Sequence, residues 1–479
     1  MAQYTTLLQP SHDEYNIDGS EQIADDRAAY DMQAQKPFEA DTLNTEIMTY
    51  RPSTANWEES NEIQVRIGCT DEHWLDLQSL RLHLDFVIKK KDGATYTAAV
   101  KEQKTYITSN LIPMLFSKID VELDHTKMMI NNCNYGLASA MLRILNNSSK
   151  EADFLKTSEY YQSHLANPNT ETYTTADTND AIPEETEENY SWRWELIDVG
   201  LKVSVEMEIF HYFLQQPKKL PPAVKFALKF TRNKSEKIFN WHSDLDGNPP
   251  IVSFLDFHVR MKRVRLDADA TVQRLDSITS KNAVVDMPIT RYTTQTITIP
   301  KLTYVNITPL LSGNIPRRLA IGFVRNEAVS DSGHKRFDSL YFENLGIERL
   351  FIKYDNKVYP KEGGYTLDQN AVEGRQKKMA HRKIYMEVMR TWRGTHFDSE
   401  LTFDQWQTLY NLYTFDLTPN MKSYNSLNYE QMKMIGDLSL EIIFKNAPRN
   451  DYSLVMLCEY NNTLSIDMQS MTPIFDFSN

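Results

Sequence analysis

The chain has 479 residues, a mass of 55.7 kDa and a formal net charge of -13 at pH 7. A chain of this length is longer than a single hydrophobic core usually supports, so two or three domains are expected. The mean hydropathy of -0.52, with no apolar run approaching about 18 residues, excludes a protein with a membrane-spanning helix.

The first residues of the chain, MAQYTTLLQPSHDEYN, have neither a basic start nor an apolar centre. No secretory signal is therefore expected, and the sequence indicates an intracellular product. The three cysteines, Cys69, Cys133 and Cys458, form no CxxC pair. Their number and spacing favour neither a disulfide framework nor a cysteine-based zinc site.

Acidic residues concentrate in two segments. Residues 1–60 hold 12 acids against Arg27, Lys36 and Arg51, a local charge of -9, and contain few large apolar groups. They are predicted to form an acidic N-terminal arm, which is either a segment that orders against a partner or a solubilising tail. Residues 151–190 are predicted to form a long acidic surface loop within the first domain. Such acidity argues against a protein that coats nucleic acid.

Strands dominate the first half of the chain, because apolar and polar residues alternate there with a period of two. A phase slip at Lys262–Arg263, before Val264, predicts a β-bulge. The alternating apolar positions run from Leu80 to Ile88, Ile119 to Leu123, Val203 to Ile209, Val224 to Phe230 and Leu255 to Met261.

A second group of strands follows a polar linker, residues 267–283. Two groups of about two hundred residues each predict a mainly β protein with two tandem β-sandwiches, at 61–266 and 284–479. The alternating positions of the second group are Ile297 and Ile299, Leu319 to Phe323, Leu350 to Tyr354, Leu438 to Phe444, and Leu454 to Tyr460.

Helices are expected to be few and short, inserted in loops of the β framework. Thr402 and Gln405 form a capping box ahead of an apolar face that runs from Trp406 to Tyr413, so a helix is predicted there. Residues 135–144 are a weaker candidate for a second helix.

Motifs of catalysis are absent from the sequence, including phosphate loops, dinucleotide turns, zinc helices, nucleophile elbows and EF-hand loops. His258 is expected at the surface, on the outward face of its strand. The adjacent acids Glu184 and Glu185 are assigned to a solvated loop rather than to an acid–base pair. The basic run RQKKMAHRK (375–383) is either a solvated loop, a nuclear-import signal or a contact for an acidic partner. We predict no enzyme and no catalytic, cofactor-binding or metal-ligating residue.

Residues 311–329, LSGNIPRRLAIGFVRNEAV, predict a strand buried on both faces. Pro316 suits the start of a strand, since it has no amide to donate, and every residue from Leu319 to Val324 is apolar or glycine. The Arg317–Arg318 pair is then expected at the strand entry, paired with an acid on a neighbouring chain or domain.

The segment IPRRLAIGFVRNEAVSDS (315–332) resembles the segment "lP.r..igfv.n.a..g" of the major capsid proteins of Polinton (Maverick) elements and adintoviruses. Four more segments resemble this family in the same order, and together the five reach from residue 75 to residue 444. The acidic arm and the 151–190 loop match nothing in the family. The four segments are LDLQSLRLHLDFVIKKKDG (75–93), LIPMLFSKIDVELD (111–124), FDLTP (415–419) and GDLSLEIIF (436–444).

The resemblance implies a double jelly roll, that is, two eight-stranded sandwiches side by side. It further implies a homotrimer that forms a pseudo-hexameric capsomer in the icosahedral shell of a double-stranded DNA virus. The implied partners are neighbouring capsomers, a single jelly-roll penton protein and minor or cement proteins, without sequence-specific nucleic-acid binding. The implied location is the virion, with assembly inside the host cell, expected in the nucleus.

Two rival classes stay open. A β-sandwich carbohydrate-binding protein or enzyme would need a concave site with convergent polar and aromatic groups. A minor virion component or a cellular scaffold is the other class. The length of two sandwiches argues against a single jelly-roll vertex protein, and the lack of repeats or heptads argues against a fibre.

Overall fold

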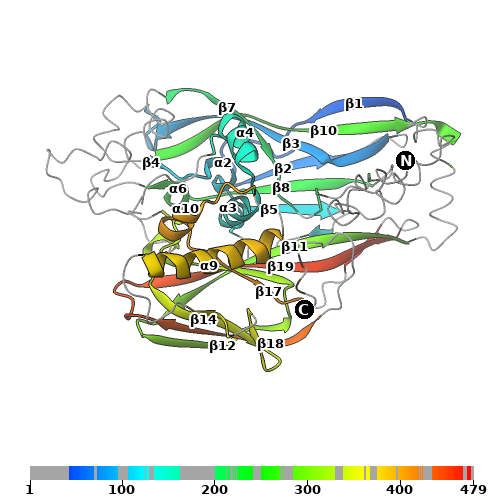
Figure 1. Cartoon of the computed structure of the whole chain (residues 1–479). Helices are drawn as coiled ribbons and strands as arrows, with labels where there is room; N and C mark the ends of the chain where they lie inside the picture. The colour runs from blue at the N-terminus through cyan, green and yellow to red at the C-terminus, as the bar shows by residue number, and fades with distance from the viewer. Residues whose placement is uncertain are drawn as a thin grey trace, which may run out of the picture.

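The computed structural model is mainly β, with the two halves of the chain stacked side by side (Figure 1). It describes residues 42–475, except for 69–72, 95–105, 124–125, 129–133, 162–199, 212, 216–218, 221, 223, 241–249, 270–271, 273–283, 330–337, 361–362, 367–374, 395–397, 420, 422, 424–433 and 468–471.

The first half forms two four-stranded antiparallel sheets. The first, sheet A, has the order β1-β10-β3-β7, the second has the order β2-β8-β5-β6, and β4 (Tyr106–Ile107) pairs with β9 (Phe239–Asn240) apart from both. Counted along the chain, the eight principal strands lie in the orders 1-8-3-6 and 2-7-4-5, which is the jelly-roll arrangement. Those eight strands are β1 (Thr42–Tyr50), β2 (Glu62–Ile67), β3 (His73–Lys90), β5 (Phe116–Leu123), β6 (Thr126–Met128), β7 (Val203–Glu208), β8 (Phe226–Arg232) and β10 (Pro250–Leu266).

The second half repeats this topology strand for strand. One sheet, sheet D, has the order β11-β19-β13-β17 and the other has the order β12-β18-β14-β15, with β20 (Thr472–Phe475) beside β19 and β16 (Tyr365–Thr366) beside β14. The prediction of two tandem eight-stranded sandwiches is therefore confirmed. The principal strands are β11 (Val284–Ile299), β12 (Tyr304–Asn314), β13 (Arg318–Arg325), β14 (Ile347–Tyr354), β15 (Lys357–Tyr359), β17 (Tyr413–Asp416), β18 (Ile435–Phe444) and β19 (Tyr452–Asp467).

The burial of individual strands follows their sequence patterns. β13 is buried continuously from Arg318 to Val324, as a strand that is apolar on both faces should be. In β10 the pairing with β3 shifts register between Arg260 and Lys262, next to the predicted bulge. A second shift, between Phe254 and Asp256, leaves Leu255 out of register and 46% exposed, so Leu255 does not lie on the buried face as the sequence predicted.

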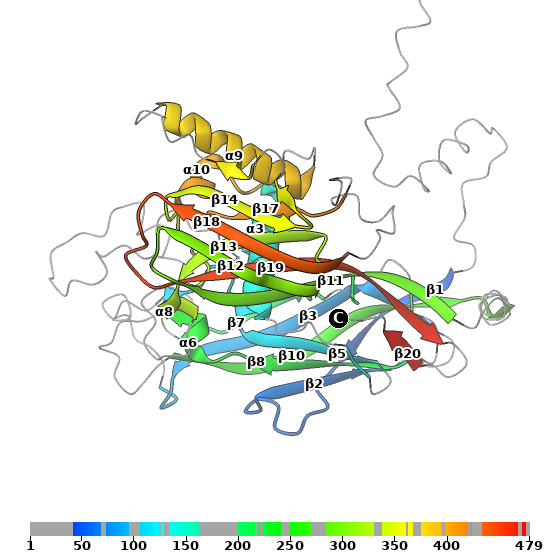
Figure 2. The ribbon, with the colours of Figure 1, turned by 90° about the horizontal axis from the view of Figure 1, so that it is seen from below.

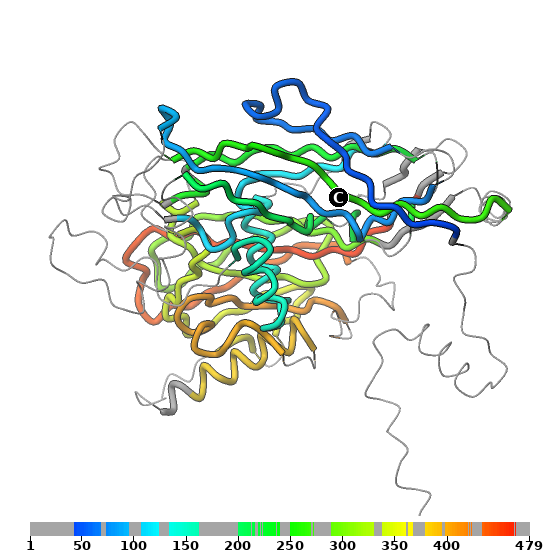
Figure 3. The backbone as a smooth tube through the Cα atoms, turned by 90° about the horizontal axis from the view of Figure 1, so that it is seen from above, coloured from blue at the N-terminus to red at the C-terminus, as the bar shows by residue number. Residues whose placement is uncertain are grey.

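Part of the predicted N-terminal arm belongs to the first sandwich. Residues 42–50 form β1, which pairs with β10 from Thr42–Leu266 to Tyr50–Val259 (Figure 3). The prediction of an arm over 1–60 is wrong for this segment, because β1 completes the edge of sheet A. Residues 1–41 lie outside the described residues. Between the sandwiches, β10 ends at Leu266 and β11 begins at Val284.

Two of the helices confirm sequence expectations, with different bounds. α3 (Tyr135–Asn146) covers the weaker candidate and is buried along most of its length. α10 (Phe403–Thr408) has the predicted capping box but ends before Leu409, whose φ of -123° is not helical, and Tyr413 starts β17. The short helices α2 (Leu111–Met114), α6 (Ser235–Ile238) and α8 (Asn326–Val329) lie between strands.

Two other helices lie where the sequence predicted loops. The basic run 375–383 is not a loop, because it begins α9 (Arg375–Arg393), whose Ile384, Val388 and Trp392 are buried at helical spacing. Figure 2 shows α9 along the outer side of the second sandwich. The predicted acidic loop is helical at its start, as α4 (Ser149–Glu159), which begins with a capping box from Ser148. Among the described helices, none has the length and apolar character needed to cross a membrane.

The hydrophobic cores of the two sandwiches meet at α3. This helix lies in the first half of the sequence, yet its residues Leu137, Met141 and Leu145 belong to the apolar cluster of the second sandwich. It packs against α2 and β5 of the first half and against β11 and α9 of the second. The backbones of α2 and α3 approach closely at Gly136, where an added Cβ would lie 2.8 Å from the Cα of Met114.

The Gly136→Ala variant is therefore expected to destabilise the protein by about 1–3 kcal/mol, because the added methyl group collides with backbone that cannot rotate away. Urea unfolding followed by tryptophan fluorescence measures this cost. Gly68→Ala is the matched control, since its Cβ would meet only Lys225 Cγ at 4.0 Å, and a change within about 0.5 kcal/mol is expected. Equal stability of both variants would contradict close packing at α3.

Candidate functional site

A cluster of buried charges stands at the start of β13. The side chain of Glu459 on β19 is fully buried, and Arg317 and Arg318 converge on it with side chains 6% and 9% exposed. Arg318 donates from Nε and Nη2 to Glu459 Oε2, at 3.0 and 2.6 Å, and Arg317 makes an ion pair with the other oxygen. Asp416 is a second nearby carboxylate, and its charge favours the charged form of both guanidinium groups.

Arg318 also fastens helix α9 to sheet D. Its Nη1 donates to the backbone oxygen of Trp392 at 2.7 Å, and its guanidinium carbon lies 4.3 Å from the centre of the Trp392 ring. Trp392 Nε1 donates in turn to Asn146 Oδ1 at 2.7 Å, at the end of α3. An unbroken path of contacts therefore joins Glu459 to the first half of the chain.

The FDLTP segment lies on the other side of the same arginine. Asp416 on β17 stands opposite Arg318 in the sheet register. Its carboxylate accepts hydrogen bonds from Thr418 and from Ser423, at 2.5–3.0 Å, and so shapes the turn after β17. Two segments that resemble the capsid family, IPRRLAIGFV and FDLTP, are thus neighbours in sheet D.

The predicted partner of the arginine pair is corrected by this geometry. Arg317 and Arg318 are buried against an acid of their own sandwich, because Glu459 stands directly across from Arg318 on the adjacent strand. Their role inside this chain is to neutralise a buried acid and to hold α9. Sequence reasoning missed Glu459 because cross-strand register joins residues 141 positions apart.

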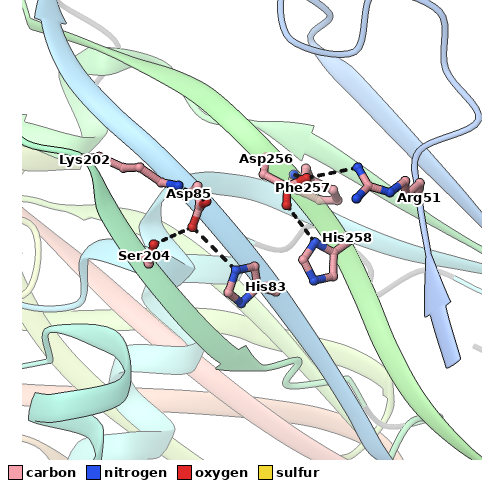
Figure 4. Close-up of polar contacts among 8 residues, drawn as sticks. All are labelled: Arg51, His83, Asp85, Lys202, Ser204, Asp256, Phe257 and His258. Atoms are coloured by element: carbon pink, nitrogen blue, oxygen red, sulfur yellow. Dashed lines mark hydrogen bonds and ion pairs between the residues drawn. The ribbon is translucent and has the colours of Figure 1, made fainter. Parts of the chain in front are cut away.

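A second polar cluster lies on sheet A (Figure 4). His83 on β3 and His258 on β10 are opposite each other in register, and their rings stack with centroids 4.5 Å apart and planes at 28°. Each ring has a carboxylate beside it. His258 Nδ1 lies 3.1 Å from Asp256 Oδ2, and His83 Nε2 lies 3.5 Å from Asp85 Oδ1.

Cations and a hydroxyl group hold these carboxylates in place. Lys202 Nζ lies 2.6 Å from Asp85 Oδ2, and Ser204 donates to Asp85 Oδ1 at 2.6 Å. Burial acts to raise the pKa of Asp85, but these hydrogen bonds outweigh it and the pKa lies below its usual value. On the other side, Arg51 approaches Asp256 at 3.4 Å.

The prediction that His258 is a surface residue is wrong. Its strand position does face outward, but the residue is only 5% exposed because the His83 ring covers it. Burial lowers the pKa of His258 below its usual value and so favours the neutral ring. The neighbouring Asp256 carboxylate acts in the opposite direction but is outweighed. This polar cluster combines residues of two strands, so no spacing motif in the sequence predicts it.

The remaining candidates offer no reactive group among the described residues. Cys458 is buried in β19, and burial raises the pKa of its thiol to about 12. His381 is buried on α9. The residues Glu184, Glu185, His396, Cys69 and Cys133 lie outside the described ranges.

A groove of about 610 Å³ runs between α4 and β7. Its lining is mainly charged, with Arg81, Lys150 and Glu206 among the contributors, and Phe154 is its aromatic residue. A carbohydrate site would combine several aromatic faces with convergent polar groups. This groove lacks that combination.

Solved structures share the fold over nearly the whole chain. A chain of the Sputnik virophage, solved by electron cryomicroscopy, has a TM-score of 0.61 at 11% identity, covering 94% of this chain and 92% of that one. A chain of the PBCV-1 virus capsid has a TM-score of 0.53 at 12% identity, covering 93% and 99%. No protein-family profile matches the chain, and no curated protein matches its sequence.

Replacing Glu459 by Gln is expected to destabilise the protein by about 3–5 kcal/mol, because two buried guanidinium groups lose their counter-charge. Glu441→Gln on β18 is the matched control: its partner Lys353 is 46% exposed, so a loss below about 1 kcal/mol is expected. Urea unfolding measures both. Similar costs for the two variants would show that the Glu459 cluster is not a special constraint.

Proposed function

We propose that this chain is a major capsid protein that forms the icosahedral shell of a double-stranded DNA virus. One observation carries the proposal, namely that both halves of the chain form jelly rolls of identical strand order, side by side. The likeness to a chain of the PBCV-1 virus capsid, over 99% of that chain, supports it. The resemblance of five sequence segments to Polinton and adintovirus capsid proteins points to the same function, and we place the chain in that branch.

The proposed assembly unit is a homotrimer. Three chains with two similar sandwiches each present six similar lobes, and a closed threefold arrangement of such chains has a pseudo-hexagonal outline. Hexagonal outlines tile the flat facets of an icosahedral shell, and the proposed penton protein supplies the fivefold vertices that close it. The packing of α3 against both sandwiches supports this proposal, because lobes that moved independently would not keep a six-lobed outline.

The proposed role is structural rather than enzymatic. Arg317, Arg318 and Glu459 are paired with one another within the chain, and each of the three side chains is less than 10% exposed. Neighbouring capsomers, a penton protein and minor or cement proteins are the proposed partners in the virion shell, and the nucleus of the host cell is the proposed site of assembly. The acidic segment 151–190 suits a solvated face of the capsomer, where its charge limits non-specific association.

Light scattering of the purified protein is expected to give a mass of about 167 kDa, three times the chain mass of 55.7 kDa. Negative-stain images of the same sample are expected to show a pseudo-hexagonal outline. A monomer of 55.7 kDa at high concentration, without six-lobed particles, would contradict the proposal and return the β-sandwich binding protein or enzyme to first place.

Deleting residues 1–41 is expected to leave trimers intact but to impair shell assembly, because the proposed acidic arm orders against neighbouring subunits. The measurement is light scattering for trimers and electron microscopy for shells. Deleting 1–50 serves as the contrast, since it also removes β1, exposes the edge of β10 and is expected to destabilise the first sandwich. Equal shell assembly by the 1–41 deletion and the full chain would reject a role for the arm.

A further inference from the structure

We propose that His83, Asp256 and His258 bind a divalent transition-metal ion, with zinc as the fitting ion. One ligand atom from each of these residues lies within 4.8 Å of the other two. Zinc bonds of about 2.0–2.1 Å place tetrahedral ligand atoms about 3.3 Å apart. Binding therefore requires the two imidazole rings to turn out of their stack, because the lone pair of a ring nitrogen lies in the plane of its ring.

The imidazole rings have free coordinating capacity. The atoms His83 Nδ1 and His258 Nε2 are buried and have no hydrogen-bond partner among the described residues. The His258 residue as a whole is only 5% exposed. A buried ring nitrogen normally finds a partner. His83 directs Nε2 toward Asp85, which leaves Nδ1 for the ion, whereas His258 Nδ1 lies 3.1 Å from Asp256 Oδ2, close to the spacing of two ligands on one zinc ion. Neutral imidazole with a lone pair is the form that binds metal.

The surrounding residues complete the features of a metal site. Asp85, held by Lys202 and Ser204, orients His83 as outer carboxylates orient metal-binding histidines. Two imidazoles and one carboxylate suit zinc better than magnesium, which prefers six oxygen ligands. Asp256 has a side chain 30% exposed and His83 one 24% exposed, so solvent reaches the cluster and an ion can enter. Three protein ligands leave the fourth tetrahedral position to water.

The metal would join the two central strands of sheet A. β3 and β10 already pair along most of their length, and the Arg51–Asp256 contact brings the end of β1 to the same point. An ion at this position ties residues 83 and 258 together across the sheet. Bound zinc is therefore expected to stabilise the first sandwich.

The test is isothermal titration calorimetry of zinc chloride into the full-length protein after removal of metals with a chelator. One zinc ion per chain is expected to bind saturably, and magnesium chloride at the same concentration is not expected to compete. His83→Gln and Asp256→Asn are expected to weaken zinc binding at least tenfold, and Asp85→Asn about tenfold. Zinc is expected to raise the melting temperature of the wild type by about 2–4 °C.

Glu206→Gln is the matched control, because Glu206 stands opposite His83 in register but outside the ligand set. It is expected to bind zinc like the wild type. Circular dichroism of each variant without zinc verifies its fold. Absence of saturable zinc binding by the folded wild type, or equal affinity of wild type, His83→Gln and Asp256→Asn, would overturn the site.

A cobalt titration keeps the proposal testable if the ligand variants do not fold. Cobalt(II) in a tetrahedral nitrogen and oxygen site gives visible absorption bands, which are expected in the wild-type protein and should be bleached by one equivalent of zinc. A wild-type spectrum that stays like that of hydrated cobalt would refute tetrahedral binding at this cluster.

Discussion

The second sandwich depends on a carboxylate that water cannot reach. A buried charge is tolerated only when it is paired and hydrogen-bonded, and Glu459 meets that condition through Arg317 and Arg318 on the adjacent strand. The strand register fixes all three positions, so the ion cluster and the sheet specify each other. Because Arg318 also stacks on Trp392, the compensation of one charge and the docking of a helix are a single interaction.

That helix leads to the other half of the molecule. Trp392 donates a hydrogen bond to Asn146 at the end of α3, and Arg393 donates one to the backbone oxygen of Asn147, the residue after that helix. These two bonds join α9 to the first half of the chain. Arg143 on α3 forms an ion pair with Glu159 in α4. The two jelly rolls are therefore packed against each other through α3 and α9.

Strand periodicity predicted the two sandwiches, because a strand buried on one face alternates apolar and polar residues along consecutive positions. It did not predict α9, whose buried Ile384 and Trp392 stand among many basic residues that resemble a solvated loop. The alternation of apolar and polar residues along β10 also predicted that His258 faces outward. It did not predict that the ring of His83 stacks on His258 and buries it. The ion partners and the metal ligands come from strands distant in sequence, and their register is set by the whole sheet.

The pairing of first with last strands has a consequence for synthesis on the ribosome. Thr42 of β1 pairs with Leu266 of β10, and Val284 of β11 with Asp467 of β19, so neither jelly roll closes until its final strand has been made. At about 5–20 residues per second, β1 waits roughly 10–45 s for its partner. The first roll completes this closure before most of the second exists. The face of α3 that belongs to the second core stays open to solvent meanwhile, as an apolar surface that the nascent chain must protect.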